Sequence, residues 1–232
     1  RLPMSKIADQ STVDDINGLL VTTEATLTFS SNEQTEGQRF LGKLGLNPND
    51  KFVCLNVRDE MFLRQSEPIG WTKNRDWSYH NYRDSDISTY VKAADALAEM
   101  GYTVFRMGAL VKEPLVSKHP RVIDYATNGM RTEFLDVFLG AYCAFCISTG
   151  SGWDSVPTIF RRPILFVNLL PIFSPSANTL PITIYPKLLG SQGSPTSLSL
   201  IELIQRNLAS SSNTMACADA GVEIRDLSSE EL

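Results

Sequence analysis

Short apolar runs alternate with amphipathic segments along most of the chain. Runs of four to seven mostly apolar residues are typical of strands buried on both faces of a sheet. We predict strands at 51–57, 102–107, 122–125, 144–147 and 164–168. The segments between them carry apolar residues three and four positions apart, the spacing of a helix that covers a core. We predict helices at 33–44, 87–100, 132–141, 152–160 and 198–208.

This alternation predicts an α/β fold, with a Rossmann-like parallel sheet and helices on both of its faces. Ser30 and Glu33 match a capping box, and Thr132 is placed to cap the helix that follows it. The segment 171–196 is rich in Pro and Ser, so we expect a loop there with one extended piece. Weaker strand patterns occur at 25–29, 182–185 and 222–225.

The two ends of the chain differ from its middle. Residues 1–48 are mostly irregular, and we interpret them as a linker or a remnant of an N-terminal domain. Residues 49–232 form the Rossmann-like domain. The chain starts without Met, and Ser228–Leu232 resembles the first turn of a helix. We therefore expect further sequence beyond both ends.

Polar residues gather where the predicted strands end. Arg58 and Asp59 follow the first strand, and Arg106 and Gly108 follow the second. The third strand ends near Asp124 and Tyr125, which we expect to line a ligand pocket. Because parallel strands end at one edge of the sheet, and such sheets bind ligands there, we expect a site at this edge.

Two of these residues are arginines, and a fourth strand leads into a loop of small residues. A guanidinium can bind a diphosphate with two hydrogen bonds, although a salt bridge, to Asp59 for instance, is an equal alternative for either arginine. A small-residue loop before a helix can bind phosphate or be an ordinary tight turn, and this one matches neither glycine-rich phosphate motif. The loop consists of Ser148, Thr149, Gly150, Ser151 and Gly152.

A long polar segment, 60–86, contains two tryptophans, two tyrosines and a histidine. Loops of this length are typical of functional sites. His80 is a candidate general base because imidazole titrates near neutral pH, with a surface-loop histidine as the alternative. Asp86 is a second candidate, although its place just before a helix also suits an N-cap. We interpret Asp136 as part of the solvent-facing stripe of its helix.

Composition narrows the classes of function. Lys and Arg number 21 and Asp and Glu number 26, so the net charge of 21 − 26 = −5 excludes general nucleic-acid binding. Residues 51–132 hold twelve basic and ten acidic residues, which favours an anionic ligand in that part of the chain. No apolar stretch reaches the roughly 20 residues of a membrane span. We interpret Cys143 and Cys146 as core residues and expect no metal site.

These segments together resemble a family of bacterial glycosyltransferases of the GT-B type. The resemblance covers about half of the chain and implies the C-terminal, donor-binding half of a two-domain enzyme. The loop is similar to the donor-phosphate loop of heptosyltransferase-like enzymes. The strand end at Arg58 is similar to the arginine motif with which fucosyltransferases bind the diphosphate of GDP-fucose. The matching segments are 53–59, 79–87, 104–108, 122–126, 133–139, 148–152 and 159–164.

The resemblance implies transfer of a hexosyl- or fucosyl-like sugar from a nucleotide-diphosphate donor to a hydroxyl of a glycan or other acceptor. It implies bacterial glycan or surface polysaccharide synthesis, in the cytoplasm or at the inner face of the membrane, without a metal ion or other cofactor. We assign acid–base chemistry to His80 and Asp86. We assign binding of the donor to Arg58, Asp59, Arg106, Gly108, Asp124, Tyr125 and 148–152. A nucleotide-sugar epimerase and a non-catalytic sugar- or nucleotide-binding module are the alternatives, and the oligomeric state is open.

Overall fold

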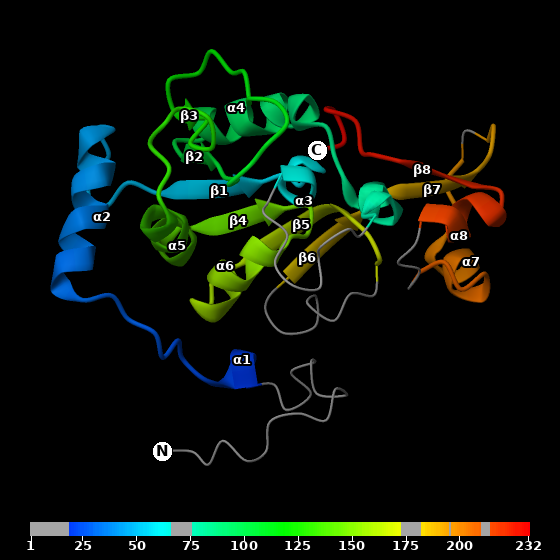
Figure 1. Cartoon of the computed structure of the whole chain (residues 1–232), viewed down its shortest axis with the longest axis horizontal. Coiled ribbons are helices and arrows are strands. Elements are labelled where there is room, and N and C mark those ends of the chain that lie inside the picture. Colours follow the sequence, from blue (N-terminus) through cyan, green and yellow to red (C-terminus); the bar gives the residue numbers. More distant parts are fainter. Residues whose placement is uncertain (1–18, 66–75, 173–181, 195, 210–213) are drawn as a thin grey trace.

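A computed structural model describes residues 19–65, 76–172, 182–194, 196–209 and 214–232 (Figure 1). Six strands form one parallel sheet in the order β3-β2-β1-β4-β5-β6. This is the strand order of a doubly wound Rossmann sheet, so the predicted fold class is confirmed. The strands are β1 (Phe52–Asn56), β2 (Thr103–Arg106), β3 (Val122–Ile123), β4 (Phe145–Ser148), β5 (Ile164–Leu169) and β6 (Ile182–Pro186).

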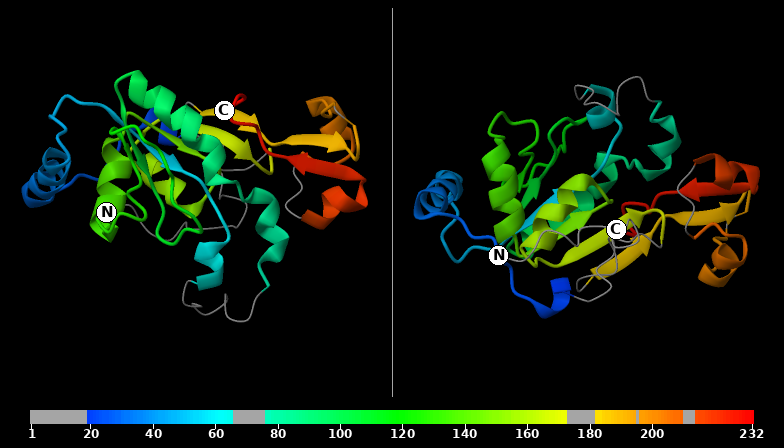
Figure 2. Two further views of the ribbon diagram at one scale, coloured as in Figure 1. Left: turned by 90° about the horizontal axis from the view of Figure 1, so that it is seen from above. Right: turned by 60° about the horizontal axis from the view of Figure 1, so that its bottom comes forward.

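Helices cover both faces of the sheet (Figure 2). On one face, α5 (Glu133–Tyr142) packs on Phe52, Cys54 and Phe105. On the other face, the 3-10 helix η5 (Ile87–Tyr90) and α4 (Val91–Glu99) pack on Val53 and Val104. Successive residues of β1 thus enter two different cores, because side chains alternate along a strand. All five residues of β1 are buried, as its apolar sequence predicts.

Helix α2 (Ser31–Lys43) begins with the predicted capping box between Ser30 and Glu33. It packs on the α5 face of the sheet, with Leu41 in the same core as β1 and Phe40 beside it. The prediction of a strand at 25–29 is wrong, since these residues pair with no other strand. The predicted domain division at residue 48 stays a prediction.

Gly37 is the point at which α2 meets α5. A Cβ atom added there would lie 2.2 Å from the ring of Phe138, which is itself fully buried. We expect Gly37→Ala to push the helices apart and to lower the free energy of unfolding by about 1–3 kcal/mol. Gly42→Ala is the matched control in the same helix: its Cβ would meet nothing within 4 Å, so it should be neutral or stabilising. Urea unfolding compares the two variants, and equal effects would contradict this packing.

A small second lobe adjoins the β6 end of the sheet (Figure 1). Its strands β7 (Leu188–Ser191) and β8 (Val222–Arg225) pair antiparallel, and α7 (Leu200–Gln205) and α8 (Thr214–Asp219) belong to it. The lobe has a core of its own, which includes Leu189 and Cys217 and is completed by Tyr82 from the 3-10 helix η4 (Ser78–Arg83). The lobe therefore packs directly on the segment that the sequence singled out.

Several elements differ from the predictions. The piece expected at 182–185 is a full edge strand, β6, paired with β5. The short helices α1 (Leu19–Thr22) and α3 (Met61–Gln65) and strand β7 were not expected. The helix predicted at 152–160 divides into the 3-10 turn η6 (Gly152–Asp154) and α6 (Ser155–Ile159). Cys143 and Cys146 are buried in the core, as predicted.

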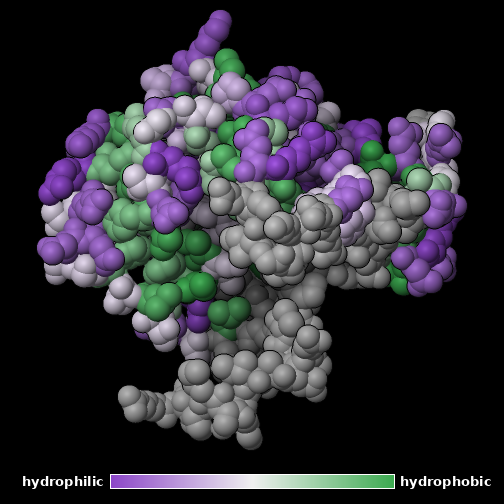
Figure 3. All heavy atoms as spheres, viewed as in Figure 1, coloured by the Kyte–Doolittle hydropathy of each residue, from purple (hydrophilic) through white to green (hydrophobic). Residues whose placement is uncertain are grey.

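The surface seen in Figure 3 is hydrophilic over much of its area, and apolar residues gather on it around α5 and α6. Val137, Tyr142 and Ile159 are among the exposed apolar side chains of these helices. Within the described ranges, we find no helix whose length and apolar character would suit a membrane span.

Candidate functional site

A cavity of about 500 Å³ lies beyond the carboxyl ends of β1, β2 and β4. Strand order reverses between β1 and β4, so this is the switch point at which doubly wound sheets bind ligands. The volume suits a small-molecule ligand. We call it the switch-point cavity; its lining is 56–59, Phe62, Leu63, Trp77, His80, Arg83, 108–111, Asp136 and 151–153. The cavity thus lies at the edge of the sheet where the sequence predicts a ligand site.

Arg58 lies two residues past the end of β1 and is the central cation of this lining. Its backbone N–H donates to Thr149 Oγ1 at 2.9 Å, which joins it to the loop after β4. Its Nη1 donates to the carbonyl of His80 at 3.3 Å and pairs with the Asp84 carboxylate. Among the residues that the structure describes, we find no partner for its Nε and Nη2. The salt bridge foreseen as an alternative therefore exists, with Asp84, and leaves donors for a ligand.

Burial affects both members of the Arg58–Asp84 pair. It lowers the pKa of the Arg58 guanidinium, and the nearby Asp84 carboxylate opposes this. It raises the pKa of the Asp84 carboxyl, which the charges of Arg58 and Lys187 oppose. The two opposite charges thus stabilise each other in a partly buried environment. In such an environment, hydrogen bonds to an anionic ligand are stronger than in water.

Helix η4 supplies a second cation and an aromatic wall. Arg83 Nη2 donates to the carbonyl of Gly150 at 2.9 Å, so this side chain bridges η4 and the loop after β4. Trp77 stacks near His80, with ring centroids 5.7 Å apart and planes 19° apart. Both rings line the cavity, as does Trp153 from the loop. The segment 60–86 is therefore a wall of the site, although its residues 66–75, including Trp71, lie outside the described part of the chain.

The loop after β4 is organised by a buried carboxylate, Asp154. Asp154 accepts hydrogen bonds from Ser148 Oγ at 2.6 Å, the Ser151 N–H at 2.6 Å and Asn56 Nδ2 at 3.2 Å. Asn56 ends β1, so the network ties the loop to the neighbouring strand. Burial raises the pKa of the Asp154 carboxyl, and these three hydrogen bonds oppose the rise.

The same network uses most N–H groups of the loop. The N–H of Thr149 donates to the Asn56 carbonyl, that of Gly150 to Ser148 Oγ and that of Ser151 to Asp154. Ser148 and Thr149 are completely buried beneath the cavity, whereas Ser151 and Gly152 line it. Gly150 has φ +90°, and a Cβ there would lie 2.6 Å from Leu169, so the turn requires glycine. Phosphate binding by this loop stays a prediction.

Asp136 lines the cavity, so placing it on the solvent-facing stripe of its helix was wrong. Its Oδ2 accepts from Arg131 at 2.6 Å, and its carbonyl accepts from Trp153 Nε1 at 3.2 Å. Burial raises the pKa of the Asp136 carboxyl, although the charge of Arg131 opposes this. The residue therefore fixes one aromatic ring of the cavity and adds a carboxylate to it.

The raised pKa of Asp136 has a consequence for stability. A carboxyl with a higher pKa in the folded than in the unfolded chain favours folding when protonated, and this contribution is lost as the pH rises above the ordinary value of 3.8. Asp136→Asn cannot lose a proton there. As the pH rises above about 4, we therefore expect the free energy of unfolding of this variant to increase relative to that of the wild type. Urea unfolding at several pH values measures the difference, and a difference independent of pH would contradict the assignment.

Besides Ser148, Thr149 and Gly150 of the loop, three more predicted donor-binding residues do not line the cavity. Arg106 is fully buried, with its Nη1 3.5 Å from Asp124 Oδ1 and its Nη2 donating to the Glu113 carbonyl at 3.1 Å. Asp124 also accepts from the Leu115 N–H at 3.0 Å, so the pair fixes the loop after β2. Tyr125 is completely buried, and its hydroxyl accepts from the Thr132 N–H at 3.0 Å. For Arg106, the salt bridge is the arrangement observed.

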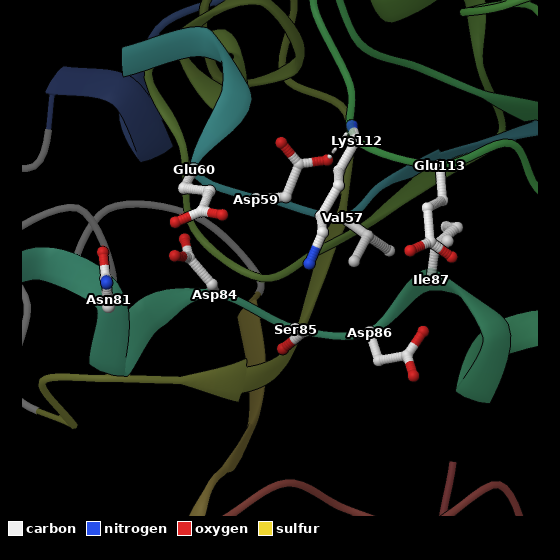
Figure 4. A pocket seen from close by; sticks show the side chains of 10 residues that line it. All are labelled: Val57, Asp59, Glu60, Asn81, Asp84, Ser85, Asp86, Ile87, Lys112 and Glu113. Carbon is white, nitrogen blue, oxygen red and sulfur yellow. Dashed lines mark hydrogen bonds between the residues drawn. The ribbon is translucent and has the colours of Figure 1, made fainter. Parts of the chain in front are cut away.

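A second cavity, of about 430 Å³, lies beside the first and is acidic (Figure 4). Asp59 lines both cavities, and its carboxylate accepts from the backbone N–H groups of Met61 at 2.9 Å and Lys112 at 2.8 Å. Asp86 lines only this acidic cavity. It accepts from the Ser88 N–H at 2.8 Å and caps η5, as the alternative reading foresaw. Glu60, Asp84 and Glu113 are the other carboxylates of the lining, and Lys112 is its cation.

The structure brings together some of the predicted site residues, and their roles stay predictions. Of the predicted residues, Arg58, Asp59, His80, Gly108, Ser151 and Gly152 meet in the switch-point cavity. Arg83 and Trp153, for which sequence reasoning gave no role, also line the cavity. So do Trp77, which it named only as one ring of the aromatic segment 60–86, and Asp136, which it placed on the solvent-facing stripe. The closeness of Trp153 to the small-residue loop is the one signal in the sequence that could have indicated it. Within the described ranges, no group of three His, Cys, Asp or Glu side chains is arranged to hold a metal ion.

Comparison with known proteins gives likenesses in structure only. A glycosyl transferase of family 9 from Veillonella parvula has a TM-score of 0.47 at 13% identity, over 69% of this chain and 42% of that one. For the ADP-heptose LPS heptosyltransferase II of E. coli, the TM-score is 0.41 at 15% identity, over 70% and 45%. For the wall teichoic acid polymerase TagF, it is 0.36 at 19% identity, over 73% and 38%.

The chain spans less than half of the length of each of these proteins. The first two are glycosyltransferases, as the resemblance in sequence led us to expect. Likenesses of this size carry no conclusion about activity. No family model matches the chain, and no curated protein sequence matches it significantly.

Proposed function

We propose that the chain binds a nucleotide-diphosphate sugar in the switch-point cavity, as the donor-binding half of a GT-B glycosyltransferase. The observation that carries this proposal is the convergence of Arg58, Arg83 and His80 with two tryptophan rings in one cavity. Cations and aromatic rings at a switch point are what a nucleotide diphosphate requires. The resemblance of seven sequence segments to the GT-B family supports the same reading.

The diphosphate would lie against Arg58. The Nε and Nη2 groups of Arg58 can donate to phosphate oxygens while Nη1 keeps its bond to Asp84. Breaking the bond between the sugar and the diphosphate leaves negative charge on the leaving phosphate. A guanidinium already fixed by Asp84 stabilises that charge without reorganising, and Arg83 adds a second positive charge nearby. In this proposal, arginines supply the neutralisation, and no metal ion or other cofactor is needed.

The base and the sugar would occupy the apolar part of the cavity. Trp77 and Trp153 offer ring faces for stacking, and Phe62 and Leu110, both partly exposed, extend the apolar surface. We propose a hexosyl- or fucosyl-like sugar, with GDP as one candidate nucleotide, from the resemblance at Arg58.

An acceptor hydroxyl must lose a proton during the transfer. His80 lines the switch-point cavity with Arg58, and a neutral imidazole nitrogen can accept that proton. Asp86 lies in the neighbouring acidic cavity and already caps η5, so His80 is the base that we propose. The acceptor would be a bacterial glycan, modified in the cytoplasm or at the inner face of the membrane.

A thermal-shift screen of the full-length protein tests the proposal. We expect one of the UDP-, GDP-, CDP- or dTDP-sugars, at about 100 times its Kd, to raise Tm by about 5–10 °C. The matching nucleoside, which lacks the diphosphate, should not. Stabilisation by none of the four would overturn the proposal. Product analysis then separates the alternatives: an epimerase converts the donor without an acceptor, and a binding module leaves the donor intact.

A further inference from the structure

Lys187 is a buried lysine that lines none of the described cavities. It lies between β6 and β7, at the junction of the sheet and the small lobe, and its side chain is 3% exposed. Removing an ammonium group from water is costly unless other groups compensate its charge. The partners of Lys187 therefore indicate what this residue does.

The partners lie on both sides of the junction. Lys187 Nζ is 2.6 Å from the Asp226 carboxylate, which follows β8 in the lobe. It also donates to the backbone carbonyl of Asp84, at the end of η4. The positive charge of Lys187 lowers the pKa of the Asp84 carboxyl against the effect of burial, so the ammonium also acts on that carboxylate. Asp84 in turn pairs with Arg58.

A line of alternating charges, Asp226–Lys187–Asp84–Arg58, thus runs from the lobe into the switch-point cavity. Residues next to Asp84 are joined to the site as well. The Ser85 N–H donates to the Arg58 carbonyl at 3.1 Å, and Arg83 reaches the carbonyl of Gly150. Fixing the backbone of Asp84 therefore fixes the end of η4, which carries Arg83 and His80.

We propose that Lys187 is a positioning residue for the switch-point cavity. It holds Asp84 where its carboxylate orients the guanidinium of Arg58, and it stabilises the charge of that carboxylate. Its separate bond to Asp226 attaches the small lobe to the same ammonium group. The effect on a ligand rests on the proposed function, whereas the effect on η4 does not.

Hydrogen exchange without any ligand tests the effect on η4. We expect Lys187→Met to raise amide exchange in residues 78–85 about tenfold, and Lys187→Arg to restore it. Asp226→Asn is the matched control, because it removes the other partner of Lys187 and leaves the bond to Asp84. Suppose instead that Lys187 only attaches the lobe. Lys187→Met and Asp226→Asn would then raise amide exchange equally in 188–191 and 222–225, and neither would change it in 78–85. That result would overturn the proposal. Should Lys187→Met not fold, Lys187→Gln serves in its place.

Binding of UDP, GDP, CDP and dTDP to the full-length protein tests the effect on the site. We expect Lys187→Met to weaken the binding that the wild type shows by about tenfold, and to have little further effect in an Arg58→Ala background. Equal losses in both backgrounds would show that Lys187 does not act through Arg58 and would overturn this part. If the wild type binds none of the four, the proposed function fails, and the exchange experiment still decides the role of Lys187.

Discussion

Arg58→Ala is expected to weaken the binding of a nucleoside diphosphate by about 100-fold or more. Arg58 lines the switch-point cavity, and its guanidinium is oriented by Asp84. Its Nε and Nη2 have no partner among the described residues. Its loss removes charge-assisted hydrogen bonds to the phosphates and leaves the partly buried Asp84 carboxylate facing them. Isothermal titration calorimetry with UDP, GDP, CDP and dTDP measures the change in Kd.

Arg64→Ala is the matched control for this variant. Arg64 lies in α3, six residues further along the chain, is 65% exposed and pairs with Glu60 at 2.7 Å. It carries the same charge as Arg58 but does not line the switch-point cavity, so we expect its Kd to change less than about threefold. Similar losses in the two variants would mean that only the general charge of this region matters. The diphosphate would then not bind at Arg58.

Asp154→Ala is expected to have the largest effect on stability, a loss of about 3–5 kcal/mol in the free energy of unfolding. The carboxylate accepts from Ser148, Ser151 and Asn56 in a place that is 6% exposed. Removing it takes the acceptor from the Ser148 hydroxyl and the Ser151 N–H, while Asn56 Nδ2 keeps Ser151 Oγ at 2.7 Å. The loop that carries Ser151 and Gly152 is then released. Urea unfolding measures the loss.

Asp86→Ala provides the comparison. Asp86 also accepts a hydrogen bond from a backbone N–H and caps η5, but it is exposed, so water can replace the carboxylate. We expect a loss of about 1 kcal/mol. If Asp154→Ala were no more destabilising than Asp86→Ala, the loop after β4 would not depend on the buried network.

The sheet could be predicted from the sequence because its strands are buried on both faces and therefore read as apolar runs. In the small lobe, α7 and β8 were predicted as single elements, but their assembly into a lobe was not. Strand β7 contains a glycine and pairs with β8, more than thirty residues away, so no local pattern indicates it. The edge strand β6 is partly buried on one side and exposed on the other, and its alternating pattern lies within a segment rich in Pro and Ser.

The site was predicted in part for a related reason. A position at a strand end places a residue at the correct edge but does not fix where its side chain goes. Arg106 is the last residue paired within β2, so its side chain lies in the core beneath the edge, where it pairs with Asp124. Arg58 lies beyond the end of β1 and reaches the cavity. Arg83 and Asp136 enter the site through contacts between segments far apart in the chain, which periodicity does not reveal.

The central claim is that a nucleotide diphosphate binds between Arg58 and the aromatic rings of the switch-point cavity. The indole N–H signals of Trp77 and Trp153, assigned by Trp→Phe variants, report on this place directly in a nitrogen–proton NMR titration with UDP, GDP, CDP and dTDP. We predict that both signals shift with one of these nucleotides and saturate at the same Kd, and that in Arg58→Ala both shifts saturate only at about 100-fold higher nucleotide concentration. Absence of binding, or binding that leaves both indole signals unmoved, would contradict the claim.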